Sequence, residues 1–98
     1  MRTVRKIISF EWDIHNRDKN FAKHRVTDAE CEEVFFDEKK KVLKDMLHSG
    51  TEKRHITIGR TKNNRVLFTA FTIRKHKIRV ISARDLNKKE RHLYEKES

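Results

Sequence analysis

Three long β-prone runs separated by very short connections constrain the fold of this chain more than any other feature. All three are rich in Ile, Val, Phe and Thr. They cover Arg54 to Thr61, Arg65 to Ile73 and Lys77 to Arg84. The residue pairs expected to turn between them are Asn63 with Asn64, and Lys75 with His76. Because strands joined by so few residues pair antiparallel, the sequence predicts an antiparallel meander.

Weaker patterns precede the meander. We expect a short opening strand from Ile7 to Trp12 and a further strand from Lys41 to Met46. Between them, Asp13 is a suitable N-cap for a helix that runs to about His24, because its short carboxylate can accept hydrogen bonds from free amides. The residues expected on the buried stripe of this helix are Ile14, Phe21 and Ala22.

Capping boxes mark the other two predicted helices. Thr27 and Glu30 have the spacing in which each side chain satisfies the other's backbone donor, and Asn87 and Glu90 repeat it. The first of these helices should end near Asp37. The residues expected on the apolar sides are Val26, Ala29, Cys31, Val34 and Phe35, and then Leu86, Glu90 and Leu93. The predicted order is β-α-α-β-β-β-β-α, an α+β arrangement with a curved antiparallel sheet and helices packed on one face.

Length and composition limit the cellular setting. A chain of 98 residues has room for one domain with one core. It contains no apolar run of membrane-spanning length, and too few apolar residues follow the basic start for a secretory signal. The single cysteine, Cys31, excludes an internal disulfide and fits a reducing compartment. We therefore expect one cytoplasmic domain with no membrane partner.

The charge balance indicates the kind of partner. There are 25 Lys and Arg residues against 15 Asp and Glu, a formal net charge of +10. Such a surplus favours a polyanion, nucleic acid before an acidic protein or a membrane surface, although a soluble domain can also simply be basic. The basic residues at the predicted strand ends could border an uncovered sheet face that holds RNA. They are Arg54, Arg60, Arg65, Arg74, Lys77, Arg79 and Arg84.

Several short motifs follow one another in a fixed order. The first are Phe10-Glu11-Trp12-Asp13, then Asn20, Lys23 and His24. The later ones are Val34-Phe35-Phe36-Asp37, Ile58-Gly59-Arg60-Thr61, Leu67-Phe68, Ile78-Arg79-Val80-Ile81-Ser82-Ala83-Arg84, Lys89-Glu90-Arg91 and Leu93-Tyr94-Glu95. In this order and spacing they resemble the BrnT family of toxins. Only Met1 to Ile7 and Lys39 to Lys53 are poorly covered by the resemblance.

The chain departs from the family pattern at three positions. Asn16 stands where the family usually has lysine, Arg25 where it usually has glycine, and Asp28 where it often has phenylalanine. Glycine is favoured in left-handed helix caps, so Arg25 suggests a different geometry at the end of the first helix. A role that the family assigns to a basic residue at position 16 is not expected of Asn16.

The resemblance implies a RelE-like fold and a ribonuclease that inhibits translation without a cofactor. It also implies a neighbouring antitoxin, BrnA, with a ribbon-helix-helix DNA-binding part. In that family the complex inhibits the toxin and represses its own operon. The toxin would therefore meet operator DNA only through the antitoxin.

RNA carries its own nucleophile, the ribose 2′-hydroxyl, so catalysis requires alignment, proton transfer and stabilisation of the phosphorane charge. Arginines can stabilise that negative charge in place of a metal, because their planar fork matches two phosphate oxygens. Our candidates for proton transfer are His24, Lys23 and Glu52, and those for phosphate clamping are Arg60, Arg79 and Arg84. Our candidates for RNA binding are Arg54, Arg65, Arg74, Lys77 and Tyr94, the last by stacking on a base or lending its hydroxyl.

Each candidate also has a structural interpretation. His24 can simply complement the dipole at a helix end. Arg84 can pair with Asp85 or Glu90, and Tyr94 can pack against the sheet. The lysine and glutamate candidates can be solvated surface charges. These alternatives stay open at the level of sequence.

The remaining histidines do not suggest a metal site. They form neither an H-E-x-x-H motif nor a His-Cys cluster, and one thiol cannot build a structural zinc site. The leading hypothesis is thus a metal-independent endoribonuclease. The alternatives are an RNA- or operator-binding module without activity, and an assembly partner whose basic face receives an acidic antitoxin segment.

Overall fold

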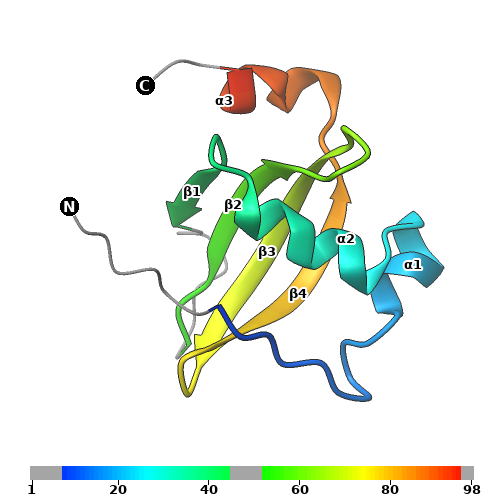
Figure 1. The fold of residues 1–98 in the computed structure, drawn as a ribbon, viewed down its shortest axis with the longest axis vertical. Coiled ribbons are helices and arrows are strands. Elements are labelled where there is room, and N and C mark those ends of the chain that lie inside the picture. Colours follow the sequence, from blue (N-terminus) through cyan, green and yellow to red (C-terminus); the bar gives the residue numbers. More distant parts are fainter. Residues whose placement is uncertain (1–7, 45–51, 96–98) are drawn as a thin grey trace.

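The computed structural model describes residues 8–44 and 52–95 and has an α+β architecture, as the sequence predicts (Figure 1). The helical elements are α1 (Lys19–His24), α2 (Asp28–Glu33), α3 (Arg91–Glu95) and the short 3₁₀ turns η1 (Val34–Phe36) and η2 (Lys88–Glu90). The strands are β1 (Lys41–Lys44), β2 (His55–Arg60), β3 (Val66–Arg74) and β4 (Lys77–Asp85). The strands form one open sheet in the order β1-β2-β3-β4, and every neighbouring pair is antiparallel.

The predicted meander is confirmed, with each boundary of β2, β3 and β4 within one residue of the expected one. Asn64 has a φ of 65°, and the Thr61 hydroxyl accepts hydrogen bonds from the amides of Asn63 and Arg65 across that turn. Lys75 and His76 both have positive φ, as a two-residue hairpin turn requires. The predicted β1 begins at Lys41 as expected, and its last two residues lie outside the described part of the chain.

The main core lies between one face of the sheet and α2 with η1. It consists of Val26, Cys31, Val34, Phe35, Leu67, Phe71, Val80 and Ala83. The Phe35 ring meets Phe10 and Phe71 edge-on, with centroid distances of 5.4 and 5.0 Å. Gly59 is needed here, because a Cβ at this position would lie 2.7 Å from the carbonyl oxygen of Val34. The sheet and η1 therefore touch backbone to backbone.

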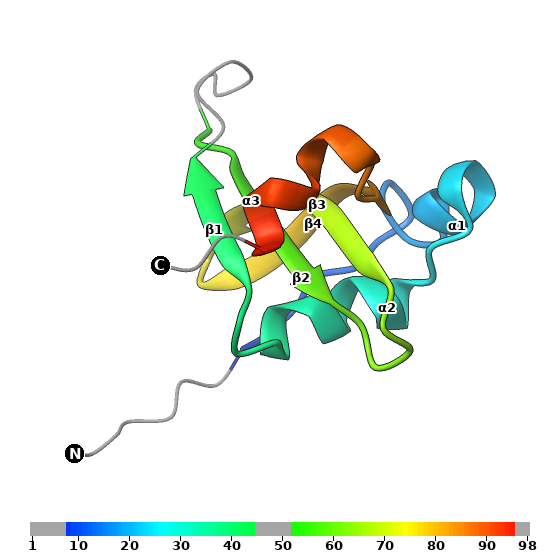
Figure 2. The same cartoon turned by 90° about the horizontal axis from the view of Figure 1, so that it is seen from above.

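The expectation that all helices pack on one face is wrong. Consecutive strand residues point to opposite faces, and Gly59 faces η1 whereas the Arg60 guanidinium lies over the ring of Tyr94 in α3. In Figure 2, α2 and α3 accordingly lie on different sides of the sheet. Ile58, on the same face as Arg60, is fully buried. The second face therefore also has apolar surface that needs a cover.

The predicted opening strand is wrong for residues 8–12, which form only one isolated parallel bridge, Phe10 with Ile78. A continued ladder would need the carbonyl of Val80. That oxygen instead accepts from the Asn16 side-chain amide at 3.1 Å. Asn16 also accepts from the amide of Asp13 at 2.8 Å, so the chain turns away from the sheet. At the position where the family usually has lysine, this chain thus has a buried structural amide.

The first helix is shorter than predicted. The Asp13 carboxylate accepts from the amide of His15 in a local turn, and the helix begins only at Lys19, after Asp18 with a φ of 60°. The expected apolar stripe is also wrong, since Ile14 is 80% exposed and Phe21 42%, and Ala22 is exposed too. Polar residues are buried in their place. The helix does end at His24, as expected.

Arg25 adopts the left-handed cap that glycine usually provides, with φ 58° and ψ 33°. Its amide donates to the carbonyl of Phe21, and the amide of Val26 donates to that of Asn20. The suggestion of a different helix-end geometry is therefore wrong. The chain keeps the geometry and accepts the strain of a β-carbon there.

Both predicted capping boxes are confirmed, at Thr27 with Glu30 and at Asn87 with Glu90. The second helix passes into η1 and ends just before Asp37, as expected. Val26 and Cys31 are both fully buried at its start, whereas Ala29 is exposed, contrary to expectation. The residues expected on the inner side of the last helix are all partly buried.

Candidate nucleic-acid interface

The structure separates the predicted site residues into two groups at opposite ends of the sheet. One end, where β2 and β4 finish and β3 begins, is called here the basic end. It carries Lys23, His24, Arg60, Arg65, Arg84 and Tyr94. The other end, around the β3–β4 hairpin, is called the hairpin end and carries Glu52, Arg54, Arg74, Lys77 and Arg79. The candidates therefore do not form one site.

At the hairpin end, arginines are held by carboxylates. Arg79, with a side chain only 13% exposed, donates to Asp13 at 2.8 and 3.1 Å and to Glu11 at 3.2 Å. The hydrogen bond from Arg79 lowers the pKa of Asp13 to about 2. These bonds join the segment before α1 to β4.

Glu52, a predicted base, binds Arg74 with both carboxylate oxygens, at 2.6 and 3.0 Å. The hydrogen bond from Arg74 lowers the pKa of Glu52. A carboxylate stabilised in this way is a weaker base. It also lies at the opposite end of the sheet from His24 and Lys23.

At the basic end, a groove of about 370 Å³ lies between α1 and β4, and we call it the α1–β4 groove. Its lining consists of Lys19, Asn20, Ala22, Lys23, His24, Ile81 and Ser82. It contains two lysines and a histidine but no Asp or Glu, and within residues 8–44 and 52–95 neither lysine forms an ion pair. Such a lining attracts an anion and includes one group suited to proton transfer.

Buried polar contacts fix the position of α1 beside β4. The Asn20 side-chain oxygen accepts from the amide of Ala83 at 2.9 Å, and Asn20 is almost fully buried. Lys19 and Lys23 lie one turn apart and so share a side of the helix. The left-handed residue Arg25 then ends the helix directly after His24.

A second hollow at the basic end has a volume of about 330 Å³, and we call it the arginine pocket. Its lining consists of Arg60, Asn64, Arg65, Val66, Asp85, Leu86 and Arg91. Arg65 binds Asp85 through two hydrogen bonds of 2.6 and 3.0 Å and contacts Glu30 at 3.1 Å. The hydrogen bond from Arg65 lowers the pKa of Asp85.

Arg84 shows both an ion pair and a ring contact. It binds Glu90 through two hydrogen bonds of 2.8 Å, and its guanidinium lies 4.3 Å from the centroid of the Phe68 ring. The hydrogen bond from Arg84 lowers the pKa of Glu90. The pairing that the sequence left open is thus formed with Glu90, while Asp85 contributes only its backbone carbonyl.

Tyr94 packs at the end of the sheet and uses its hydroxyl internally. The hydroxyl donates to Asp37 at 2.7 Å, and the Arg60 guanidinium lies 5.3 Å from the ring centroid. Burial raises the pKa of Tyr94, and its bond to Asp37 adds to this. Burial alone would raise the pKa of Asp37, but hydrogen bonds from Tyr94 and from the amides of Lys39 and Arg60 lower it.

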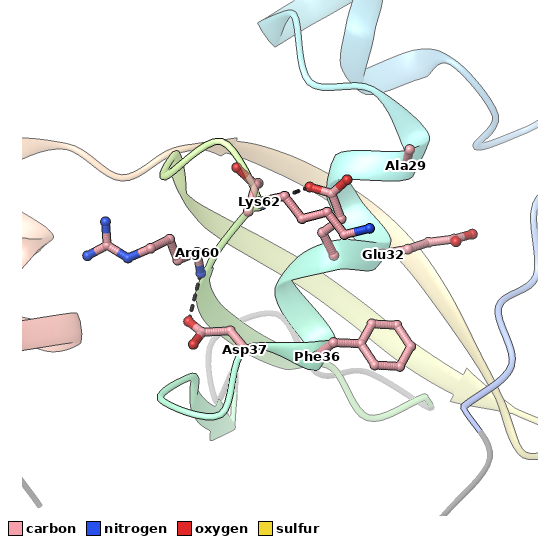
Figure 3. Close-up of a pocket in the computed structure, with 8 residues that line it drawn as sticks. Ala29, Glu32, Phe36, Asp37, Arg60 and Lys62 are labelled. Atoms are coloured by element: carbon pink, nitrogen blue, oxygen red, sulfur yellow. Dashed lines mark hydrogen bonds between the residues drawn. The ribbon is translucent and has the colours of Figure 1, made fainter.

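A third hollow, of about 610 Å³, lies on the α2 side of the sheet and has a more acidic lining (Figure 3). Glu32, Glu33 and Asp37 are among its lining residues, and the Phe36 side chain stands exposed beside them. Asp37 accepts from the backbone amide of Arg60 at 2.8 Å, while the Arg60 side chain extends away from Phe36. The Arg60 guanidinium is therefore counted with the basic end.

Several residues that line the hollows of the basic end were not predicted as site residues, among them Lys19, Asn64, Ser82 and Arg91. Lys19 has the i, i+4 spacing to Lys23, which would have indicated it once the helix start was known. Asp37, which holds Tyr94, gave no signal because 57 positions separate the two residues.

The described residues contain no group of three or more His, Cys, Asp or Glu side chains arranged to hold a metal ion. Among the same residues, no helix has the length and apolar character needed to cross a bilayer.

A basic α+β domain with cationic hollows at one end of an open sheet has the features typical of polyanion-binding proteins. A family model narrows this class. The family described as "Ribonuclease toxin, BrnT, of type II toxin-antitoxin system" matches residues 12–90, and the chain belongs to this family. A search of curated proteins found no match. Membership in this family supports the role of a ribonuclease toxin for this chain, with RNA as its substrate and an antitoxin as its partner.

Proposed function

We propose that this protein is a metal-independent endoribonuclease that cleaves RNA by attack of the ribose 2′-hydroxyl and thereby inhibits translation. The observation that carries the proposal is the α1–β4 groove. In a chain of a ribonuclease family, this groove combines an imidazole with two lysines and has no lining carboxylate.

The reaction needs two proton movements and no outside reactant. The 2′-oxygen loses its proton and bonds to phosphorus, the bond from phosphorus to the 5′-oxygen breaks, and the leaving oxygen gains a proton. The products are a 2′,3′-cyclic phosphate and a 5′-hydroxyl. Imidazole can accept or donate a proton near neutral pH, so we assign proton transfer to His24, with Lys23 as the second proton carrier.

Cationic side chains stabilise the phosphorane charge in this proposal. Lys19 lines the same groove, and Arg84 follows two residues after Ser82 on β4. Arginine stays charged at any working pH and donates to two oxygens at once. Arg60 contributes charge from the neighbouring pocket. Glu52 and Arg79 keep structural roles at the hairpin end.

The 3′ ends of the cleaved RNA test the proposal. Purified protein should cleave a mixed RNA pool in excess chelator and leave 2′,3′-cyclic phosphate ends. Cleavage that stops in chelator and returns with a divalent ion would contradict metal independence. A 3′-hydroxyl product would contradict ribose attack. Salt-dependent RNA binding by folded protein without cleavage would favour the non-catalytic alternative.

We further propose a cytoplasmic partner, a BrnA-type ribbon-helix-helix antitoxin that covers the basic end. The excess of positive charge there favours an acidic antitoxin segment, and the same surface would then hold either RNA or antitoxin. Operator DNA would be contacted by the antitoxin alone. Competition measures this directly: the antitoxin should displace a bound RNA oligonucleotide, and simultaneous binding of both would contradict the shared surface.

A further inference from the structure

We propose that the arginine pocket is a second phosphate subsite, which binds the backbone of a single-stranded RNA beyond the phosphate held in the α1–β4 groove. This inference rests on the proposed ribonuclease function and extends it to a substrate that spans several nucleotides.

The charge of the pocket favours an anion. Three guanidinium groups line it against one carboxylate, Asp85, which Arg65 already neutralises. Within residues 8–44 and 52–95, Arg60 has no carboxylate within ion-pair distance, and Asp37 attracts it only at longer range. Among the same described residues, the one ion pair of Arg91 is a long contact of 3.8 Å to Glu95, with both side chains 64% exposed. Exposed pairs of that kind contribute little, so the charges of Arg60 and Arg91 are only partly balanced and can attract an anion.

The pocket is also preorganised. The Tyr94 ring lies beneath the Arg60 guanidinium, and the bond from Tyr94 to Asp37 holds that ring in place. Arg91 follows directly on the capping box of Asn87 and Glu90. The Arg60 side chain, held in this way, loses less conformational freedom when it binds, while the capping box fixes only the backbone position from which Arg91 extends. The last helical segment therefore completes the pocket.

The two hollows of the basic end are neighbours. Arg65 lines the arginine pocket, and its guanidinium donates to the backbone carbonyls of His24 at 3.1 Å and Arg25 at 2.7 Å. His24 lines the α1–β4 groove. A strand whose reacting phosphate lies in that groove can thus place a neighbouring phosphate in the pocket. The guanidinium fork and the Asn64 amide match phosphate oxygens and read no base.

Binding of a non-cleavable oligonucleotide tests this subsite apart from catalysis. The probe is a fluorescent single strand with 2′-O-methyl riboses, which lacks the nucleophile, and its anisotropy is followed over a range of salt concentrations. Arg91→Gln and Arg60→Gln should each weaken binding several-fold. Each should also lower the slope of log affinity against log salt by about 0.7, the value for one phosphate contact on a single strand.

The matched control is Lys77→Gln, which removes one exposed positive charge at the hairpin end. It should leave the slope unchanged. Equal slopes for Arg91→Gln and Lys77→Gln, with both variants folded by circular dichroism, would overturn the subsite. A competition experiment could also overturn it. If poly-glutamate displaces the probe from the wild type better than unlabelled RNA does, and this advantage is lost in Arg91→Gln, the pocket is a site for acidic protein.

The proposed function and the subsite can fail separately. If Arg91→Gln and Lys77→Gln have equal slopes while the protein cleaves RNA as proposed, only the subsite is contradicted. Absence of cleavage with the slope difference intact removes the catalytic proposal and leaves an RNA-binding pocket.

Discussion

Both ends of the sheet carry basic residues, and the two ends differ in how many of those residues are paired with carboxylates. At the hairpin end, Arg74 and Arg79 are held by Glu52, Asp13 and Glu11. At the basic end, Arg65 and Arg84 are also paired with carboxylates, but two lysines, a histidine and two further arginines line hollows with few carboxylates. A count of basic residues therefore does not by itself locate a polyanion site. The positions of the balancing acids distinguish the two ends, and they are the basis on which we propose the basic end as the site.

Removal of His24 should change RNA cleavage more than any other substitution considered. We expect His24→Ala to lower the rate of RNA cleavage about 100-fold or more, the usual loss when a general acid or base is removed. His76→Ala, in the exposed turn of the hairpin end, is the control and should cleave normally. Equal rates for both variants would remove His24 from the proposed mechanism.

The arginines on β4 contrast the two ends directly. Arg84→Ala should lower the cleavage rate about tenfold or more because it removes charge beside the groove. Arg79→Ala should keep the rate but lower the thermal midpoint by several degrees, since it leaves Asp13 and Glu11 without their partner.

A further control separates charge from structure at Arg84. Glu90→Gln keeps a capping side chain and leaves the arginine charged. It should retain cleavage. If Glu90→Gln loses as much activity as Arg84→Ala, cleavage depends on the ion pair between the two residues rather than on the guanidinium charge alone.

Acid should release the hairpin end from its arginine. The pKa of Asp13 is lowered to about 2, so its bond to Arg79 stabilises the fold above the ordinary carboxyl pKa of 3.8 and is lost as the pH falls toward 2. The thermal midpoint of Asp13→Asn should therefore lie below that of the wild type at pH 5. The two midpoints should converge near pH 2. A constant difference over this range would contradict the assignment.

The smallest expected effect concerns the backbone beside His24. Arg25→Gly relieves a left-handed conformation at a residue with a β-carbon, so it should raise the free energy of unfolding by up to about 1 kcal/mol. Chemical denaturation measures this change, with Arg17→Gly, in the exposed turn before α1, as the control that should not stabilise. Destabilisation by Arg25→Gly would show that the contact of its guanidinium with Phe21 outweighs the strain.

The sequence predicted those parts of the fold that depend on local pattern. The three strong strands and both capping boxes needed only neighbouring residues, and they are confirmed. The start of α1 failed because it depends on a distant partner, since Asp13 binds Arg79 and Asn16 takes the carbonyl of Val80. A local cap rule cannot anticipate such contacts.

The candidate site was predictable only in its residue types. Arg60 and Arg79 looked equivalent as basic residues of strands. The register places Arg60 opposite Val66 at the start of β3 and Arg79 opposite Thr72 near its end, and this separates them. The contact of Arg60 with Tyr94 depends on α3 crossing to the second face, which no sequence pattern indicated.

One oxygen atom of Glu90 accepts two hydrogen bonds from different parts of the chain. Its Oε1 accepts from the amide of Asn87 to start the last helical segment, and it also accepts from Arg84. The onset of that segment and the orientation of Arg84 are therefore thermodynamically linked. An anion that draws the guanidinium aside changes the surroundings of the Asn87 amide, so the NMR signal of that amide becomes a reporter of occupancy at a side chain on another element.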